Sequence, residues 1–313
     1  MATIVRNVAL LGATGILGPH LLKALTSAGH SVTVIQRKES TKEAPQGVKS
    51  VKIDLSSFDD LVSVFKGQDV FVSAVPNPTL ASDKVIIDAA IAASVKRIIP
   101  SEFTTNLDTP LSRKLPHVLG KVEVREYLES VVPASPSTTW TSINNGAFLE
   151  LCLKFGILGP NLMQKTATFH DGGEKVVGAS LLPDIGTALV KVLEPGHFEE
   201  TANKPVYFYS AAISEKMLTR LASEATGIDF GSVEDGRIPN LKVEDMVRDA
   251  NERLAKGDKS AMITYYFPMM YSEGYGGTDF KKLSWNEKLG LRVLSEDELK
   301  ELFKQAAKEL GVL

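Results

Sequence analysis

A glycine-rich turn near the start of the chain limits its fold more than any other feature. Val8–Leu11 is an uninterrupted apolar run, as expected for a parallel strand that is covered on both faces. The turn Gly12-Ala13-Thr14-Gly15-Ile16-Leu17-Gly18 follows it and opens residues 16–28, where leucines recur at helical spacing up to Gly29. A strand, a glycine turn and a helix in this order predict the first part of a parallel α/β sheet.

The same alternation continues for about 150 residues. Further apolar runs predict strands at 31–35, 48–53, 70–75, 97–99 and 138–143, with helices at 58–66, 82–94 and 117–130. This order predicts a Rossmann-type, doubly wound parallel sheet over residues 1–150. Residues 151–313 are expected to form a smaller α/β domain that binds substrate, with some late segments returning to the first sheet. That part contains an expected strand at 206–209 and helices at 214–226, 241–256 and 295–309.

Composition excludes several other classes of protein. The 313 residues are 43% hydrophobic and 23% charged with a net charge of −3, which argues against disorder and against a broad field for nucleic acid. Cys152 is the single cysteine, so no intrachain disulfide can form, and the five histidines show no metal-binding spacing. No apolar stretch reaches the ~18–20 residues of a membrane helix, and no signal-peptide pattern precedes Val8. We expect a cytoplasmic protein that binds neither membrane nor nucleic acid. It could be a monomer or a homodimer.

The glycine spacing points to a dinucleotide. Gly12 can form the tight turn, Gly15 can let the backbone approach a pyrophosphate, and Gly18 can let helix and sheet pack closely. The N-terminus of the helix would offer free N–H groups to the phosphates. The alternative is an ordinary glycine turn that binds nothing.

Two cations end the second predicted strand, where an NAD site would usually carry Asp or Glu. Arg37 can hold a 2′-phosphate through two hydrogen bonds and Lys38 can add a charge, so we predict NADP(H); both could instead be solvent-exposed charges. Asp54 could contact the adenine or cap the next helix. Ser73, Ala74 and Val75 end the fourth predicted strand at the carboxyl edge, where ligands bind in such sheets.

The usual phenol acid of short-chain reductases is absent, because none of the seven tyrosines has a lysine four residues later. The fifth predicted strand ends in Pro100-Ser101-Glu102-Phe103, and Gly120-Lys121-Val122-Glu123-Val124-Arg125 opens a helix. With the glycine turn, Gln36-Arg37-Lys38 and Pro183-Asp184-Ile185-Gly186-Thr187, these segments resemble the isoflavone reductase-like, or NmrA-like, family of atypical short-chain reductases. The resemblance extends over roughly residues 5–310 and is strongest before residue 190.

The resemblance implies roles for several residues. Lys121 would be the catalytic acid or base, since a lysine in a partly dry cleft has a lowered pKa; otherwise it is a solvated helix residue. Phe103 would pack near the nicotinamide or be a core aromatic. Asn144 and Asn145 depart from the serine-rich turn that plant members usually have there; by their chemistry they could donate hydrogen bonds to substrate or ribose, or satisfy a bend. The residues expected to hold the cofactor are Gly12, Thr14, Gly15, Ile16, Leu17, Arg37, Lys38, Ser73, Ala74, Val75, Phe103, Lys121 and Asn144.

Other segments differ from the plant reductases or stay ambiguous. Thr104-Thr105-Asn106 replaces the glycine that follows their Pro-Ser-Glu-Phe, which leaves a specific plant substrate open. The apolar residues 148–163 and the aromatic cluster 265–271 could line a pocket or belong to the core. His170-Asp171-Gly172-Gly173 is interpreted as a turn rather than a catalytic pair.

We therefore expect an NADPH-dependent reductase of a small aromatic or conjugated metabolite, belonging to secondary metabolism. The alternative is a regulator that binds the dinucleotide without catalysis and acts through protein partners. The regulators in the family generally lack the lysine, so Lys121 favours the enzyme.

Overall fold

The computed structural model describes residues 3–313, which divide into two compact units. The first consists of the chain up to Phe103, Val118–Asn144 and Leu182–Val206. The second consists of Thr104–His117, Asn145–Leu181 and Tyr207–Leu313. The chain therefore passes between the units five times.

A seven-stranded sheet forms the centre of the first unit, in the order β12-β6-β5-β4-β1-β2-β3. The neighbouring pairs from β6 to β3 are parallel, which confirms the predicted doubly wound sheet. The strands are β1 (Asn7–Leu11), β2 (Ser31–Arg37), β3 (Lys49–Ile53), β4 (Val70–Ser73), β5 (Arg97–Ile99), β6 (Thr139–Asn144) and β12 (Lys204–Tyr207), whose last residue belongs to the second unit.

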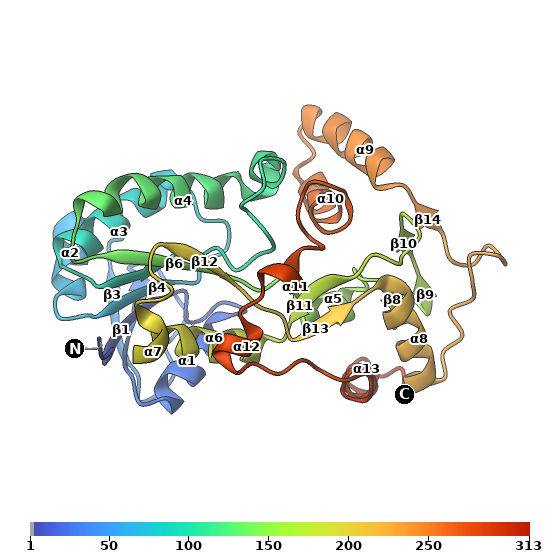
Figure 1. The fold of residues 1–313 in the computed structure, drawn as a ribbon, viewed down its shortest axis with the longest axis horizontal. Coiled ribbons are helices and arrows are strands. Elements are labelled where there is room, and N and C mark those ends of the chain that lie inside the picture. The colour runs from blue at the N-terminus through green and yellow to red at the C-terminus, as the bar shows by residue number, and fades with distance from the viewer. Residues whose placement is uncertain (1–2) are drawn as a thin grey trace. The chain divides into compact units, whose positions relative to one another are not determined.

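Helices cover both faces of this sheet, with α2, α3 and α4 on one face and α1 and α6 on the other (Figure 1). The apolar side chains of β1, β4 and β5 are buried because both faces are covered. The helices are α1 (Gly18–Ser27), α2 (Phe58–Phe65), α3 (Leu80–Ala92), α4 (Leu119–Val131), α6 (Leu182–Leu193) and α7 (Pro195–Phe198), with a 3₁₀ turn at Val132–Ala134.

Short strands and helices build the second unit around a separate apolar core. Its strands are β7 (Ala147–Phe148), β8 (Pro160–Asn161), β9 (Thr166–Ala167), β10 (Phe169–His170), β11 (Val177–Ser180), β13 (Ala211–Ile213) and β14 (Asn240–Leu241). Its helices are α5 (Leu149–Phe155), α8 (Glu215–Thr226), α9 (Val243–Ala255), α10 (Tyr266–Tyr271), α11 (Phe280–Leu283), α12 (Asn286–Leu289) and α13 (Glu296–Glu309). Further 3₁₀ turns lie at Ser112–Lys114, at Lys259–Tyr265 and at Pro116–Val118, whose last residue belongs to the first unit.

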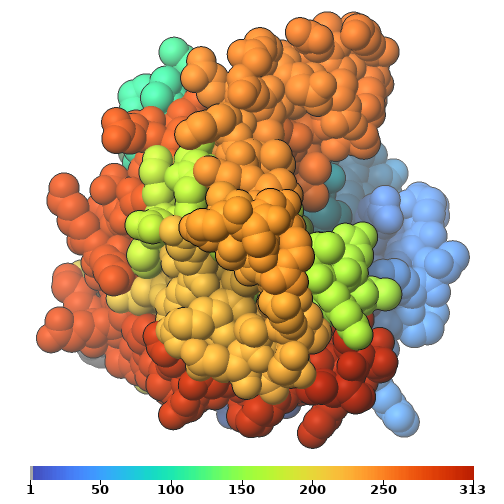
Figure 2. Space-filling view, turned by 90° about the vertical axis from the view of Figure 1, so that its right-hand side faces the viewer, coloured from blue at the N-terminus to red at the C-terminus, as the bar shows by residue number. Residues whose placement is uncertain are grey.

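Local signals explain the longer helices of this unit. Ser214 caps α8 by accepting a hydrogen bond from the Met217 N–H, and Gly227 ends the helix in the left-handed conformation. Ser295 and Glu298 form a reciprocal capping box at the start of α13. The segment after α8 then crosses the surface of that helix, as the orange residues over the gold ones show in Figure 2.

None of the helices among residues 3–313 combines the length and apolar character that crossing a bilayer requires.

Candidate functional site

The turn between β1 and α1 requires glycine at two of its positions. Gly12 adopts a φ of +90°, and a Cβ there would lie 2.5 Å from the Ala74 carbonyl oxygen. A Cβ at Gly18, where α1 begins, would lie only 2.1 Å from the Gly12 carbonyl oxygen. Glycine is therefore required at both positions, and the start of α1 packs directly against the turn.

A cleft of about 520 Å³ opens beside this turn at the carboxyl edge of the sheet. It is bordered by the glycine turn, by Gln36 and Arg37 at the end of β2 with Glu39–Lys42 beyond it, and by the loop Ala74–Pro78 after β4. The predicted cofactor residues that line it are Gly12, Thr14, Gly15, Arg37, Ala74 and Val75.

The other predicted cofactor residues lie outside the lining of this cleft. Ile16 is exposed, Leu17 is buried at the start of α1, and Lys38 is exposed at the end of β2. The Ser73 hydroxyl is buried and has no hydrogen-bond partner among residues 3–313. Such an unsatisfied polar atom at the strand end fits a ligand that would complete its bonding.

The rim of the cleft near β2 carries two cations, Arg37 and Lys42, and one carboxylate, Glu39. Arg37 is exposed and forms no ion pair with any residue of the described chain, 3–313. Lys42 donates from its Nζ to the Thr14 carbonyl oxygen at 3.1 Å, and Gln36 donates from Nε2 to the Lys42 carbonyl oxygen at 2.7 Å. Sequence reasoning missed Lys42 and Gln36; the buried polar Gln36 at the end of an apolar strand was the available signal. Asp54 does not cap α2, because Ser57 does.

The turn after β5 lies next to the loop after β4. The Ser101 hydroxyl donates to the Val75 carbonyl oxygen at 2.6 Å, which ties the two strand ends together. Phe103 follows with a φ of +29°, an unusual conformation for a residue with a side chain, and is buried. The turn that holds Ser101–Phe103 is therefore fixed beside the cleft.

Lys121 enters the same region from the first turn of α4. Gly120 allows this, since a Cβ there would lie 1.9 Å from the Pro78 carbonyl oxygen in the loop that borders the cleft. The Lys121 Nζ donates to the Glu102 backbone carbonyl oxygen. Desolvation lowers the pKa of Lys121 to about 8, although the Glu102 carboxylate acts in the opposite direction. An amine with this pKa can exchange a proton near neutral pH.

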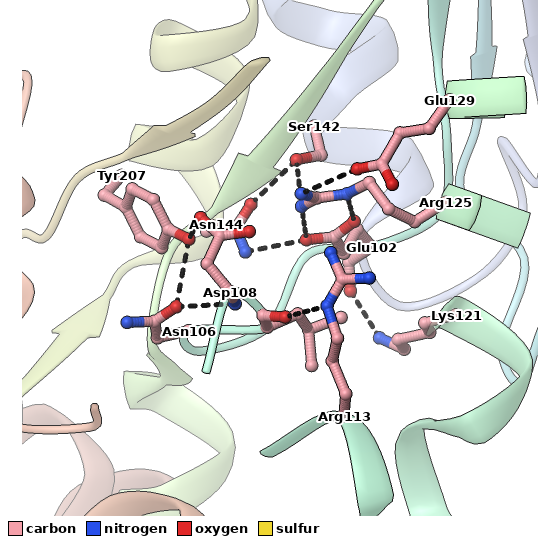
Figure 3. Close-up of polar contacts among 11 residues, drawn as sticks. Glu102, Asn106, Asp108, Arg113, Lys121, Arg125, Glu129, Ser142, Asn144 and Tyr207 are labelled. Atoms are coloured by element: carbon pink, nitrogen blue, oxygen red, sulfur yellow. Dashed lines mark hydrogen bonds and ion pairs between the residues drawn. The ribbon is translucent and has the colours of Figure 1, made fainter. Parts of the chain in front are cut away.

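The carboxylate of Glu102 forms a buried ion pair with Arg125 (Figure 3). Arg125 donates from Nε at 2.8 Å and also from Nη2, and Asn144 donates from Nδ2 at 2.8 Å. Arg125 Nη2 also donates to the Ser142 hydroxyl at 2.7 Å. Glu102, Arg125 and Asn144 are each at most 2% exposed, so these polar groups depend on one another for hydrogen bonds.

Sequence reasoning missed Glu102 and Arg125 as members of the site. Arg125 lies four residues after Lys121, one helical turn away on the same face of α4, and this spacing was the available signal. Asn144, predicted to bond substrate or ribose, here donates to Glu102.

The second unit contains two polar clusters of its own. The Tyr207 hydroxyl donates to the Asp108 carboxylate and contacts the Asn106 side-chain oxygen at 3.1 Å (Figure 3). His170 is buried with its Nδ1 2.6 Å from the Glu215 carboxylate, and its ring stacks on Phe267 at 4.1 Å between centroids. Asp171 and the two following glycines turn the chain with positive φ, as the sequence indicated.

Most of the apolar residues at 148–163 belong to the core of the second unit. Leu149, Leu153 and Leu158 are buried there, whereas Phe155 and Met163 are exposed. Tyr265, Met269 and Tyr271 are also buried. Within residues 3–313, no three His, Cys, Asp or Glu side chains are grouped as metal ligands would be.

Comparison with known proteins agrees with this architecture. Residues 5–255 match the model of the NmrA-like family. The chain is 32% identical over 303 residues to the oxidoreductase aprR of Aspergillus flavus, covering 94% of this chain and 97% of that protein.

Two solved structures share the fold at lower identity. A crystal structure of isoflavone reductase superposes with a TM-score of 0.74 at 18% identity, covering 96% of this chain and 99% of the other. AtPrR2 in complex with NADP⁺ and (+)pinoresinol superposes with a TM-score of 0.73 at 18% identity, covering 98% of this chain and all of the other. From the family match and the aprR similarity together, the chain belongs to the NmrA-like family.

Proposed function

We propose that this protein is an NADPH-dependent reductase of a small aromatic or conjugated metabolite, in which Lys121 acts as the general acid or base. The observation that carries the proposal is the placement of the Lys121 amine. The amine donates to the Glu102 carbonyl oxygen, in the turn that Ser101 ties to Val75 at the edge of the glycine cleft, and desolvation lowers its pKa to about 8. The oxidoreductase name of the Aspergillus flavus relative supports the same class of activity.

The cleft offers the groups that an NADP(H) molecule needs. The N–H groups of the glycine turn and of the start of α1 would hold the pyrophosphate. Arg37 would bind the 2′-phosphate, with Lys42 on the same rim. We further propose that the nicotinamide half of the cofactor contacts Ser73, Ala74, Val75 and Phe103. The remaining predicted residues, Lys38, Ile16, Leu17 and Asn144, would support the cofactor site from outside the lining of the cleft. The NADP⁺ complex of AtPrR2, a protein of the same fold, agrees with this choice of cofactor.

When bound, NADPH supplies the hydride that reduces an electrophilic carbon of the substrate. Lys121 would give a proton to the oxygen of the same substrate, directly or through one water molecule. The Glu102 carbonyl oxygen orients the Lys121 amine, and the packing of Gly120 against Pro78 fixes the helix turn from which the lysine extends. We propose that the second unit supplies residues that recognise the substrate.

The test is NADPH consumption with a panel of aromatic ketones, enones and benzylic ethers, measured for the protein as given and for Lys121→Ala. We expect at least one class to be reduced, and the variant to lose about 10²–10⁴-fold in kcat while still binding NADPH. Lys66→Ala, an exposed lysine at the end of α2, is the matched control and should behave as the unchanged protein.

Two results would count against this function. Undiminished turnover by Lys121→Ala would remove the lysine from the mechanism. Tight binding of NADPH without turnover of any substrate class would favour a dinucleotide-binding regulator instead.

A further inference from the structure

We propose that Glu102 and Arg125 are positioning residues for Lys121: their buried ion pair fixes the backbone carbonyl that receives the lysine amine. The inference rests on the proposed reductase function, and it assigns to this pair a part in catalysis without contact with substrate or cofactor.

Glu102 is held at two separate points by residues one turn apart on α4. Lys121 donates to its backbone carbonyl oxygen, and Arg125 donates to its carboxylate through Nε and Nη2. Two residues of β6 also take part: Asn144 donates to the Glu102 carboxylate, and the Ser142 hydroxyl accepts from Arg125. The strand β6, the turn after β5 and the helix α4 are thus joined through one buried residue.

The turn needs such support because its backbone is strained. Phe103, directly after Glu102, has a φ of +29°, which a side chain disfavours. Strain of this kind persists where surrounding contacts determine the conformation. The Ser101 bond to Val75 fixes the turn on one side, and the Glu102–Arg125 pair fixes it on the other. Without the pair, we expect the peptide between Glu102 and Phe103 to rotate and withdraw its carbonyl from Lys121.

The pair also sets the charge around the amine. The Glu102 carboxylate favours the charged form of Lys121 and desolvation opposes it. Arg125 neutralises that carboxylate, and Glu129 approaches Arg125 from the next turn of α4 at 4.0 Å. The remaining buried carboxyl on the neighbouring helix α3 is Asp83. Removing Glu102 or Arg125 singly should therefore move the pKa of Lys121 in opposite directions.

The kinetic test compares Glu102→Gln, Arg125→Met and the double variant with Glu123→Gln. Glu123 is an exposed carboxylate on the same helix and serves as the matched control. We expect kcat to fall about ten- to hundredfold in all three site variants, with the KM for NADPH changed less than about twofold, because misplacing the amine affects the chemical step alone. The double variant leaves no lone buried charge, so it remains informative if a single variant fails to fold.

A second readout does not depend on activity. Competitive labelling with acetic anhydride across a pH series, followed by mass spectrometry, gives the titration of Lys121 itself. We expect its midpoint to fall in Glu102→Gln and to rise in Arg125→Met. In the double variant, labelling at high pH should become several-fold faster, because the neutral amine is no longer held by a fixed carbonyl.

The two proposals fail in different ways. If the protein reduces a substrate and needs Lys121, but all three variants match Glu123→Gln in kcat and labelling, the positioning role is overturned and the reductase stands. If no substrate is reduced, the proposed function fails, and unchanged labelling of Lys121 in the double variant would still overturn the positioning role.

Discussion

Arg37 is an exposed cation on the rim of the cleft, at a position where a carboxylate would favour the free ribose hydroxyls of NAD. It forms no ion pair within residues 3–313, so its charge is available for a phosphate. The neighbouring Lys38 follows the end of β2, is exposed and lies outside the lining. The choice between the two dinucleotides should therefore depend on Arg37.

Replacing Arg37 with alanine tests this assignment. We expect Arg37→Ala to weaken NADPH binding by about 10- to 100-fold, in line with the ~1.5–3 kcal/mol of a hydrogen bond to a charged group. NADH has no 2′-phosphate, and its affinity should change less than about twofold. Titration calorimetry with both nucleotides measures the difference, with Lys66→Ala as control. An equal loss for both nucleotides would show that Arg37 supports the cleft rather than the phosphate.

Lys121 should also make the free energy of unfolding depend on pH. Its pKa in the folded protein, about 8, lies below the ~10.4 of an unfolded lysine, so the unfolded chain binds more protons between these values. The free energy of unfolding therefore gains a positive slope with pH over this window. Lys121→Met lacks that contribution, so we expect the stability of the unchanged protein to rise relative to the variant from pH about 8 to about 10.

Urea unfolding of both proteins across the pH series measures this effect. Curves of unfolding free energy that run parallel from pH 7 to about 10 would contradict the lowered pKa.

The buried partners of Lys121 show the limit of sequence reasoning at this scale. Glu102 and Arg125 are 23 positions apart, and charged residues are usually solvated, so nothing local indicated that they meet. The lysine itself was recognisable only through its surrounding motif. Glu102 and Arg125 meet because the chain after β5 leads back to the sheet at α4, and no local sequence pattern indicates that path.

At the scale of the elements, the position of α4 depends on a backbone contact between its first turn and the loop after β4. Val118 provides no side-chain cap, and the first turn is instead set against the loop after β4 through Gly120. We expect Gly120→Ala to destabilise the protein by about 1–3 kcal/mol, as overpacking does, and to reduce kcat by displacing Lys121. Gly196→Ala in α7, where nothing lies within 4 Å of the new Cβ, should stay within ±0.5 kcal/mol.

Chemical unfolding and steady-state kinetics of these two glycine variants provide the comparison. If Gly120→Ala matched Gly196→Ala in both measurements, the close contact with Pro78 would have no energetic importance.

The elements of the first sheet were well predicted because strands and helices alternate regularly there and many are bounded by glycine or proline. The helix predicted at 82–94 is α3 at Leu80–Ala92, and the strand at 97–99 is β5. Prediction was poorer for the second unit, where strands such as β7, β8 and β9 have two residues each. Two residues carry no periodic signal, so tertiary contacts alone determine these strands.

At the scale of the whole molecule, each unit is assembled from separate parts of the chain. The helix α6 packs on α1 with Ile185, Leu189 and Val192 buried, and a Cβ at Gly186 would lie 2.7 Å from the His20 carbonyl oxygen. The strand β12 adds an edge to the same sheet. The sequence led us to expect that some late segments return to the first sheet, but it could not identify residues 182–206 as those segments, since a surface helix in either unit has the same periodicity.

A fragment of residues 1–150 should therefore not fold as a stable domain. It lacks α6 and β12, and it uncovers the part of α1 that packs on α6, at His20 and Ala24. We expect it to bind a hydrophobic dye and to unfold without a cooperative transition, whereas the whole chain unfolds cooperatively. A sharp thermal transition of the fragment, with a helix content matching the first unit, would show that the returning segments are dispensable.

The most direct test of the account is a crystal structure of the protein grown with NADPH. We predict the 2′-phosphate against Arg37, the pyrophosphate at the glycine turn, and the nicotinamide ring within reach of the Lys121 amine through at most one water molecule. An empty glycine turn, or a Lys121 amine directed into solvent away from the ring, would contradict the account.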